Sequence, residues 1–404
     1  MNRSIWMSLV ISFCMLQVIM PANASEFTLK VFGNANMDDT IDENDIEYVD
    51  GIINGKNDMT ILADANYDGK ITETDIDQIN SIISGTEKEL TFIDCTGKNS
   101  TVHKPLDKIV AVHSSTVESL RILNRYKDII GIDEWTYSNY PTLRSDINLE
   151  SIGAYADMDA EKILKLGPGV VICGPLWHDP NIENKLKGTG IDVVRLWLSK
   201  PETNLSELRT LSYILDEEEN ALAYKEWYDK IMDEIQEKVS TLSDSQKPNV
   251  LWYRFAGENG QKTTCGGDTS YNGTIDIAGG KNIAINLKDY PELDTEWALK
   301  ENPDVILGVS FAGGYETDNS SVLKARYDDI IDTPGFNQLS AIKNNNVFVM
   351  YSALGSLCDK AYIAKWLHPD LFADMDPSAI QQEYIGEFLH LDFDIKTHGA
   401  FVYP

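Results

Sequence analysis

The chain has 404 residues, of which 43% are hydrophobic and 24% are charged, so it can bury substantial cores and has the length of roughly two to four domains. Its 64 acidic and 34 basic residues give a formal net charge of -30. A general nucleic-acid binder needs a basic surface, so this composition excludes that class and also disfavours adsorption to anionic lipid.

The first 24 residues have the features of a secretory signal peptide. Arg3 supplies the positive start, residues 5–20 are mostly apolar, and Ala22-Asn23-Ala24 is an A-x-A cleavage site. Cys14 stands in a poor context for lipid attachment. No later stretch is long and apolar enough to span a membrane. We therefore expect an exported protein that is extracellular, at the cell surface or periplasmic.

Residues 33–85 contain a repeat with an offset of 30 residues. In both copies, oxygen-bearing side chains recur at the positions of a calcium-binding loop, where alternate residues of a tight turn point at one centre. The second loop fits better because Gly69 allows a sharp turn where the first loop has Asp39. We expect two Ca²⁺ sites, with the seventh loop residue contributing its backbone carbonyl. The predicted ligand residues are Asn34, Asn36, Asp38, Thr40, Asp42 and Asp45, then Asp64, Asn66, Asp68, Lys70, Thr72 and Asp75.

A short amphipathic helix is expected behind each loop, and a Gly closes each helix. One helix per loop, tandem spacing and Asp at the last loop position resemble the dockerin type I module. The resemblance implies an all-α, EF-hand-like module over residues 25–89 that docks onto a cohesin-like domain. Dockerins usually present Ser or Thr at two contact positions, whereas this chain has Glu43-Asn44 and Glu73-Thr74 there. Alternatively, the module packs against its neighbour or serves for surface attachment.

After a short polar linker at residues 86–89, apolar strands alternate with helical stretches. Continuous β-branched runs between helices are typical of parallel sheets that are covered on both faces, so we predict an α/β fold. The expected strands are 108–112, 129–132, 170–173 and 193–197 in the first half, and 250–255, 305–309 and 347–351 in the second.

One uninterrupted helix is predicted between the two halves, from about Glu217 to Leu242. Apolar residues recur there every three or four positions without Gly or Pro, which predicts a single helical stripe about 40 Å long. The stripe consists of Ala221, Tyr224, Tyr228, Ile231, Ile235, Val239 and Leu242.

The segments on either side of this helix are similar. Residues 161–172 and 296–307 each read as a helix, a Pro-containing turn and a strand, with an offset of 135 residues. A generic helix–turn–strand unit would also resemble itself. We nevertheless predict two similar lobes, 90–215 and 244–404, joined by a linking helix at 216–243.

A series of short motifs occurs along about 310 residues, and the motifs follow one another in a fixed order. They are Pro105-x-x-Lys108-Ile-Val, Asp159-x-Glu161-Lys-Ile-Leu, Ile277-Ala-Gly-Gly-Lys-Asn, Asn302-Pro-Asp-Val, Pro334-Gly-Phe and Trp366-Leu-His-Pro-Asp-Leu-Phe. Together they resemble the class III solute-binding proteins of ABC transporters, the group for iron–siderophore complexes, haem and cobalamin. The resemblance implies a bilobal receptor with the ligand between its lobes and with a permease and its ATPase as partners.

Glu161 and Glu296 occupy equivalent places in the repeat, two residues after Asp159 and Asp294, which could cap the two helices. In related receptors, the glutamates at these motif positions dock onto arginines of the two permease subunits. Paired charges at the rim of an interface set orientation and association rate, so the resemblance implies a docking role. The alternative is that acids in a first helical turn merely suit the helix dipole.

Loops at the carboxyl ends of the strands should face the cleft. Aromatic side chains there suit a flat or bulky metal complex, and Arg254 could bind an anionic group in a bidentate manner. Taken singly, each Trp or Tyr also suits a core or rim position. The expected ligand-binding residues are His113, Trp135, Tyr137, Trp177, His178, Tyr253, Arg254, Tyr271, Tyr315 and Tyr351; Tyr140, Trp197 and Phe311 lie in the same loops.

His113 and His178 could cap a haem or corrinoid metal, or serve as plain hydrogen-bonding residues. The six histidines are too scattered for a bare-metal site, and the motifs of nucleophile elbows, P-loops, zinc proteases and dinucleotide sites are absent. We therefore expect a receptor for an iron chelate of the siderophore type and not an enzyme. The alternatives are a corrinoid or haem receptor, a dockerin-mediated surface assembly protein, and a secreted enzyme on a related fold.

Four cysteines follow the signal peptide: Cys95, Cys173, Cys265 and Cys358. An oxidising location permits pairing, and four cysteines allow three connectivities among which the sequence does not choose. Buried free thiols are the other possibility.

Overall fold

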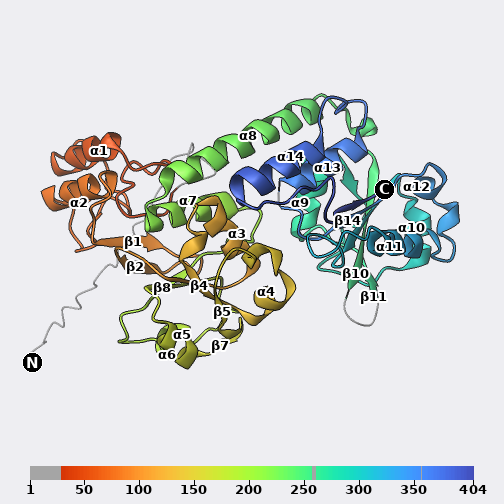
Figure 1. The fold of residues 1–404 in the computed structure, drawn as a ribbon. Coiled ribbons are helices and arrows are strands. Elements are labelled where there is room, and N and C mark those ends of the chain that lie inside the picture. The colour runs from red at the N-terminus through yellow and green to blue at the C-terminus, as the bar shows by residue number, and fades with distance from the viewer. Residues whose placement is uncertain (1–28, 257–260, 356) are drawn as a thin grey trace, which may run out of the picture.

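The computed structural model describes residues 29–256, 261–355 and 357–404, so the predicted signal peptide lies outside the described residues. Within these ranges the chain forms a small helical module, an N-terminal lobe and a C-terminal lobe in chain order (Figure 1). One long helix, α8 (Glu218–Ser240), runs from the N-terminal lobe to the C-terminal lobe. The helices of the described ranges are too short or too polar to traverse a bilayer.

The module contains two capped helices, α1 (Glu43–Ile53) and α2 (Glu73–Ile83), one behind each repeated loop. Asp42 and Thr72 are the N-cap residues, and in each helix the carboxylate of the third residue accepts a hydrogen bond from the N-cap backbone N. Each helix presents buried residues at its inner face, among them positions 49, 79 and 82. The two predicted helices are therefore confirmed.

The module packs directly onto the N-terminal lobe. Strand β1 (Glu89–Ile93) starts at the last residue of the expected linker and pairs antiparallel with β2 (Asn99–His103). Phe92 of β1 forms a β-bridge with Val31 of the module, and both side chains are fully buried. Module and lobe thus share one hydrophobic core.

Five parallel strands form the sheet of the N-terminal lobe in the order β5-β4-β3-β8-β9. Ile109 and Ala111 of β3 belong to one hydrophobic cluster and Val110 to another, so both faces of the sheet are covered, as the β-branched runs predicted. The strands are β3 (Ile109–Ala111), β4 (Ile129–Ile132), β5 (Glu150–Ser151), β8 (Val170–Cys173) and β9 (Asp192–Arg195), with a small hairpin of β6 (Gly153–Ala154) and β7 (Asp157–Met158). The helices are α3 (Ser114–Ile122), α4 (Glu134–Asn139), α5 (Ala160–Leu166), α6 (Ile182–Lys185) and α7 (Asn204–Leu215), with 3-10 turns η1 (Tyr126–Asp128) and η2 (Thr142–Arg144).

Helix α8 confirms the predicted linking helix, and its 23 residues span about 35 Å. It ends at Ser240 and not at Leu242 because Thr241 and Leu242 donate to carbonyls three residues back, which tightens the last turn. Leu242 therefore lies beyond the stripe, and Met232 joins it. The buried residues of α8 are Ala221, Tyr224, Tyr228, Ile231, Met232, Ile235 and Val239.

The sheet of the C-terminal lobe is mixed, which corrects the expectation of a parallel sheet. Its centre, β10-β13-β14, is parallel, but the edge strands β11 and β15 pair antiparallel with β10 and β14. The strands are β10 (Asn249–Ala256), β11 (Gln261–Thr263), β12 (Lys281–Asn282), β13 (Val305–Ser310), β14 (Val347–Tyr351) and β15 (Val402–Tyr403). The helices are α9 (Ser270–Ile277), α10 (Thr295–Glu301), α11 (Ser321–Ile331), α12 (Ser340–Lys343), α13 (Cys358–Leu367) and α14 (Pro377–Glu383), with short turns η3 (Asp244–Gln246), η4 (Phe336–Gln338) and the π-helical η5 (Tyr384–Phe388).

A second connection between the lobes runs through the C-terminal segment. Helix α14 and η5 lie beside α8 and extend toward the N-terminal lobe (Figure 1). There the fully buried Arg121 of α3 donates from Nη1 to the carbonyl of Leu389 at 2.9 Å. The same guanidinium binds the carbonyl of Leu143 and the carboxylate of Asp146. The lobes are therefore tied together both by α8 and by the chain after α14.

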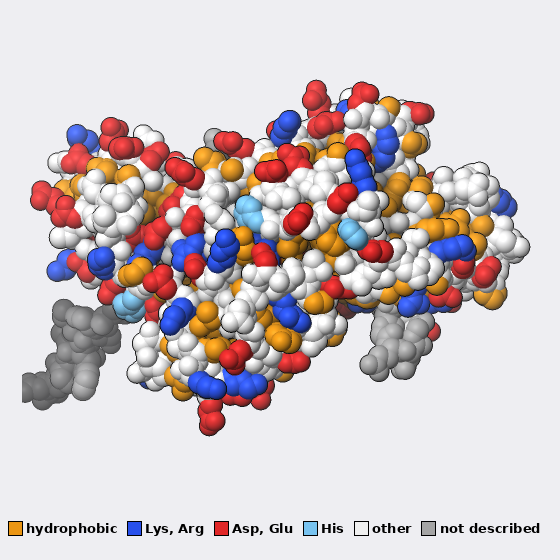
Figure 2. Space-filling view, in the orientation of Figure 1, with side chains coloured by type: hydrophobic (Ala, Val, Ile, Leu, Met, Phe, Trp, Pro, Cys, Tyr) orange, Lys and Arg blue, Asp and Glu red, His pale blue; other side chains and the backbone are white. Residues whose placement is uncertain are grey.

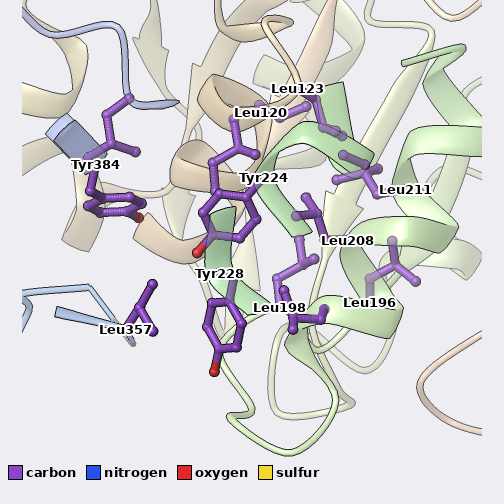
Figure 3. Packing of buried hydrophobic residues seen from close by; sticks show 14 of the residues in the cluster. Leu120, Leu123, Leu196, Leu198, Leu208, Leu211, Tyr224, Tyr228, Leu357 and Tyr384 are labelled. Carbon is purple, nitrogen blue, oxygen red and sulfur yellow. The ribbon is translucent and has the colours of Figure 1, made fainter. Parts of the chain in front are cut away.

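One continuous core joins the three parts of the molecule. Figure 3 shows Tyr224 of α8 between Leu120 and Leu208 of the N-terminal lobe and Tyr384 of η5. On the surface, acidic side chains are frequent over the module (Figure 2), in keeping with the net charge of the chain.

The four cysteines of the described chain are unpaired, and all except the half-buried Cys95 are buried. Burial raises the pKa of Cys173 to about 12, so this thiol stays protonated. Of the two possibilities left by the sequence, the structure has free thiols.

Candidate ligand-binding cleft

A cavity of about 390 Å³ lies between the two lobes and against α8. Residues at the carboxyl ends of β3, β13 and β14 line it, together with the loop after β9 and the first turns of α3 and α13. Ligands of open α/β sheets bind at such strand ends. The volume is in the range of small-molecule sites.

The structure brings three of the predicted ligand residues into this lining, His113, Tyr271 and Tyr351, and the neighbouring Tyr140 joins them. His113 is the N-cap of α3 and has a φ of 85°, an uncommon conformation for a residue with a side chain. The buried Asp133 holds it there, because its Oδ2 accepts from the His113 backbone N at 2.7 Å. Burial lowers the pKa of His113, so its imidazole is neutral.

Three other predicted residues pack against protein neighbours and are not in the cavity lining. Tyr253 is fully buried in the C-terminal lobe. Tyr315 stands edge-on to the rings of Phe393 and Phe401. The guanidinium of Arg144 lies 4.0 Å from the centre of the Tyr137 ring. Each of these rings has protein neighbours on its face or edge, which is the core alternative considered for single aromatic residues.

Further predicted residues extend from the cavity toward solvent on both lobes. In the N-terminal lobe, the ring of Trp177 is 6.4 Å from that of His113 and 46% of the residue is exposed. In the C-terminal lobe, Tyr290 lies 6.3 Å from Tyr271, and the guanidinium of Arg254 stands over Tyr290 at 4.7 Å. The exposed ring of Phe311 lies 5.4 Å from the same guanidinium, and the predicted Trp135 is an exposed residue of α4 outside the cavity lining.

His178 has a structural contact of its own. Its Nδ1 accepts a hydrogen bond from the Gly174 backbone N at 2.8 Å, which fixes the loop after β8. The side chain is buried, and burial lowers its pKa to about 3. Its ring stacks at 5.7 Å from His113, outside the cavity lining. This geometry fits the interpretation of His178 as a hydrogen-bonding residue.

Sequence reasoning missed the two acids of the cavity, Glu118 of α3 and Asp359 of α13. Glu118 stands on α3 between the fully buried Val117 and Leu120, but α3 also contains Ser, Thr and Arg residues, so the local sequence carries only a weak signal for a buried acid there. Asp359 has no comparable signal, because an acid in a first helical turn is common. Trp252, Tyr224 and Tyr384 also line the cavity without having been predicted to do so.

The electrostatics of the cavity are set by these acids. Burial raises the pKa of Glu118 to about 7, against the effect of the Tyr384 hydroxyl, which donates to its Oε2 at 3.3 Å. Burial also raises the pKa of Asp359, although the Lys360 ammonium lies 3.6 Å from its Oδ1. No Lys or Arg is among the described residues that line the cavity.

Glu161 and Glu296 lie in the first turns of α5 and α10 and are both exposed. Asp159 and Asp294 cap these helices with hydrogen bonds to the third backbone N, as the repeat predicted. Both helices end in a left-handed residue and lead into the central strands β8 and β13. The two glutamates are thus equivalent in the two lobes, and within the described chain neither carboxylate has an ion-pair partner.

Residues 109–354 match the periplasmic binding protein family. The chain belongs to this family. Its members are extracytoplasmic solute-binding proteins that work with the permease and ATPase of an ABC importer, and they act as binding proteins for transport. The bilobal fold and the interlobe cavity are those of such a protein.

Several known proteins are similar to this periplasmic binding protein over part of its length. An uncharacterized lipoprotein of Methanocaldococcus jannaschii is 23% identical over 287 residues, 64% of this chain and 69% of that protein. The TroA-like periplasmic binding protein FepB of Veillonella parvula has a TM-score of 0.64 at 21% identity, covering 78% of this chain and 99% of its own. The heme-binding protein HutB of Vibrio cholerae has a TM-score of 0.52 at 23% identity (65% and 99% covered), and the molybdate-binding protein MolA of Haemophilus influenzae 0.59 at 17% (75% and 99%). These structures show a common fold for different solutes.

The repeated loops of this binding protein precede the family match. In the second loop, side-chain oxygens of Asp64 and Asn66 both accept from the Asp68 backbone N at 3.0 Å. Asp75 accepts from the Asn66 backbone N at 3.2 Å, and Gly69 has a φ of 88°. The side chains at the first, third and last positions therefore turn toward the inside of the loop.

The first loop has the same inward pattern but is tied to the N-terminal lobe. The buried Asn34 uses its amide to donate to the carbonyl of Asp38 at 2.7 Å, a contact that an Asp could not make. Arg209 of α7 donates to the carbonyl of Asp39 at 3.1 Å. Burial raises the pKa of Asp45 to about 6, and the charges of Asp38 and Asp42 act in the same direction.

These loops fit calcium only if carboxylate, amide and backbone oxygens act together as its ligands. No three His, Cys, Asp or Glu side chains of the described residues gather in an arrangement that could hold a metal ion. Calcium loops, however, combine carboxylates with amide and backbone oxygens. By that criterion the second loop, with Asp64, Asp68, Asp75 and Gly69, fits better than the first.

Proposed function

We propose that this periplasmic binding protein captures an iron chelate of the siderophore type, or a related metal complex, between its lobes and delivers it to an ABC importer. The observation that carries the proposal is the cavity at the strand ends. Aromatic walls with a few convergent polar groups suit the bulky organic shell of a metal complex. The aromatic lining consists of Tyr140, Tyr224, Trp252, Tyr271, Tyr351 and Tyr384.

A corrinoid or haem is the alternative ligand class. The same walls accept a flat macrocycle, and the neutral imidazole of His113 is present in the lining. A neutral imidazole is the form that binds a metal. The transport class is common to both ligands, since the protein contributes binding and presentation while the ATPase partner supplies energy.

The ligand is identified by titration. Trp252 is in the lining, so its fluorescence should respond to a ferric hydroxamate siderophore, haem or cobalamin, each added to the full-length mature protein. Tyr271→Ala and Tyr351→Ala should weaken the binding of the correct compound. Tyr327→Ala on α11, outside the cavity, is the matched control. Absence of saturable binding for every compound would refute the receptor proposal.

For delivery, we propose that Glu161 and Glu296 dock onto the two permease subunits. Their exposure and their equivalent positions in the two lobes support this role. Two acids at corresponding places on two lobes match a partner with two similar subunits, and such charges orient the encounter.

We also propose that the second loop, and with less complete ligands the first, holds a structural Ca²⁺. In the second loop Asp64, Asn66, Asp68, Thr72 and Asp75 would supply side-chain oxygens and Lys70 its carbonyl. In the first loop the corresponding residues are Asn34, Asn36, Asp38, Asp42 and Asp45, with Thr40 supplying its carbonyl. Calorimetry with Ca²⁺ and Mg²⁺ tests this, and Asp64→Asn together with Asp68→Asn should remove the stronger site without changing ligand affinity.

Dockerin-mediated surface assembly is the second candidate function. The two repeated loops with their capped helices favour it. The buried contact of the module with β1 favours instead a module that is an integral part of the receptor. Calcium-dependent binding of a purified cohesin domain would support assembly, and its absence together with ligand binding by the cleft would leave the receptor function alone.

A further inference from the structure

The charge of the cavity is determined by the titratable residues of its lining. Glu118 from the N-terminal lobe and Asp359 from the C-terminal lobe both line it, and no Lys or Arg is among its described lining residues. His113, the remaining titratable nitrogen group of the lining, is neutral because burial lowers its pKa. Lys360 follows Asp359 but is itself buried and lies outside the lining. Burial raises the pKa of Glu118 to about 7, and the Lys360 ammonium lies 3.6 Å from Oδ1 of Asp359, so the surface offered to a ligand is neutral to weakly negative at pH 7.

These two acids retain unused hydrogen-bonding capacity. A carboxylate can accept about four hydrogen bonds. Glu118 accepts one, from Tyr384 at 3.3 Å, which is long for a hydroxyl donor. Oδ1 of Asp359 forms an ion pair with the Lys360 ammonium at 3.6 Å but accepts no hydrogen bond within the described chain. Buried carboxylates with a purely structural role are normally saturated, so these are placed to meet something else.

A buried donor without a partner also belongs to the lining. Trp252 is 1% exposed and lines the cavity, and its Nε1 has no hydrogen-bond partner among the described residues. An indole N–H can only donate. The cavity thus offers acceptors at the two acids, and it offers neutral donors at the indole of Trp252 and at the Tyr and Ser hydroxyls of its lining. Such a set is complementary to a ligand with ammonium or amide N–H groups and with carbonyl or hydroxamate oxygens.

We infer that Glu118 and Asp359 select a chelate that presents a cationic or hydrogen-bond-donating group to the cavity, so that neutral or positively charged metal complexes bind and anionic ones are excluded. The inference rests on the proposed function and specifies its ligand class. Arg254, the residue that would meet an anionic ligand, lies against Tyr290 and Phe311 and is absent from the lining. Bringing an anion beside two acids in a partly desolvated site is unfavourable, whereas a cation there is stabilised.

The test uses three probes with the same iron core. Ferrioxamine B carries a free ammonium and is positive, its N-acetyl derivative is neutral, and its N-succinyl derivative is negative. Affinities for the full-length protein should fall in that order, by about tenfold or more per unit of charge. Glu118→Gln and Asp359→Asn should each reduce the difference between the positive and negative probes. Glu150→Gln, which removes an exposed acid on β5 outside the cavity, should leave it unchanged.

Each outcome has one meaning. Equal or tighter binding of the succinyl derivative, or binding of haem with its two carboxylates as the sole ligand, overturns the charge selection and leaves the receptor function standing. An affinity order that both variants preserve overturns it too, because the acids would then be structural. If cobalamin alone binds, converting one of its amides to a carboxylate must weaken binding about tenfold. Binding of no probe overturns the proposed function, and the charge selection with it.

Discussion

Replacing Glu118 by Gln should stabilise the protein above neutral pH while it weakens ligand binding. Burial raises the pKa of Glu118 from 4.5 to about 7 in the folded protein. A carboxyl with a higher pKa in the folded state takes up a proton on folding. Its relative contribution is therefore most favourable below pH 4.5 and is lost as the pH rises from 4.5 through 7. Above pH 7 the Glu118 carboxylate is ionised in both states, but it is poorly solvated in the folded protein and fully solvated in the unfolded chain.

The size of the effect follows from the shift. The difference between 7 and 4.5 is 2.5 units, and at about 1.4 kcal/mol per unit this corresponds to roughly 3 kcal/mol. Water that reaches the carboxylate through the cavity reduces it, so we expect Glu118→Gln to gain about 2 kcal/mol at pH 8 and close to nothing at pH 4. For a chain of this size that is a rise of a few degrees in melting temperature.

Urea and thermal unfolding at pH 4, 6 and 8 and constant ionic strength measure this difference. The informative quantity is the stability of the variant minus that of the wild type, which should grow with pH. A difference that is the same at every pH would refute the reasoning, because the change would then reflect side-chain packing and not charge. Glu150→Gln, at an exposed acid, should show no such trend. A wild type that is more stable than Glu118→Gln at pH 8 would equally contradict a desolvated carboxylate.

Three further predictions concern the partners and the ties between the parts. Glu161→Arg combined with Glu296→Arg should abolish transport in a reconstituted importer while ligand affinity, measured by fluorescence, stays the same; lost affinity would contradict the docking role. Arg121→Met should destabilise the protein by about 3 kcal/mol, because it leaves the buried carbonyls that the guanidinium binds without donors, and unchanged urea unfolding would refute this. Chelation of calcium should lower the melting temperature. Tyr213→Phe removes the acceptor for the Ile41 backbone N at 2.8 Å, and its loss of stability should be about 1 kcal/mol larger with calcium present than with chelator. Equal losses in the two conditions would show that the first loop is ordered without metal.

The sequence predicts best where short-range physics decides the structure. The bounds of β4, β8 and β14 were predicted to the residue because continuous β-branched runs fit a doubly covered parallel sheet. The stripe of α8 follows from its period, and the caps Asp159 and Asp294 follow from residue type and spacing. Each of these features lies within one segment of chain.

What could not be predicted depends on contacts between distant segments. Strand β15 has two residues, too few to show a period, and it pairs antiparallel only because the chain returns to β14 from the far end. Glu118 and Asp359 are 241 positions apart, and no local pattern shows that they share a cavity. Tyr253 and Tyr351 both belong to strands with aromatic residues, yet one is in the core and the other lines the cavity. Side-chain direction at a strand end decides which, and that is set by tertiary packing.

The position of Glu118 connects ligand capture with the contact between the lobes. Its carboxylate accepts from Tyr384 of η5, and one turn further along α3 Arg121 donates to Leu389 in the segment after η5. The acid of the cavity is therefore part of the second tie between the lobes. A ligand that offers a better donor than the 3.3 Å contact with Tyr384 would compete for Glu118 while Arg121 keeps the segment in place. Helix α8 and the Arg121 contact both hold the lobes together during ligand binding. We therefore expect capture to proceed by local rearrangement around η5 and a small movement of the lobes, and not by a wide hinge opening.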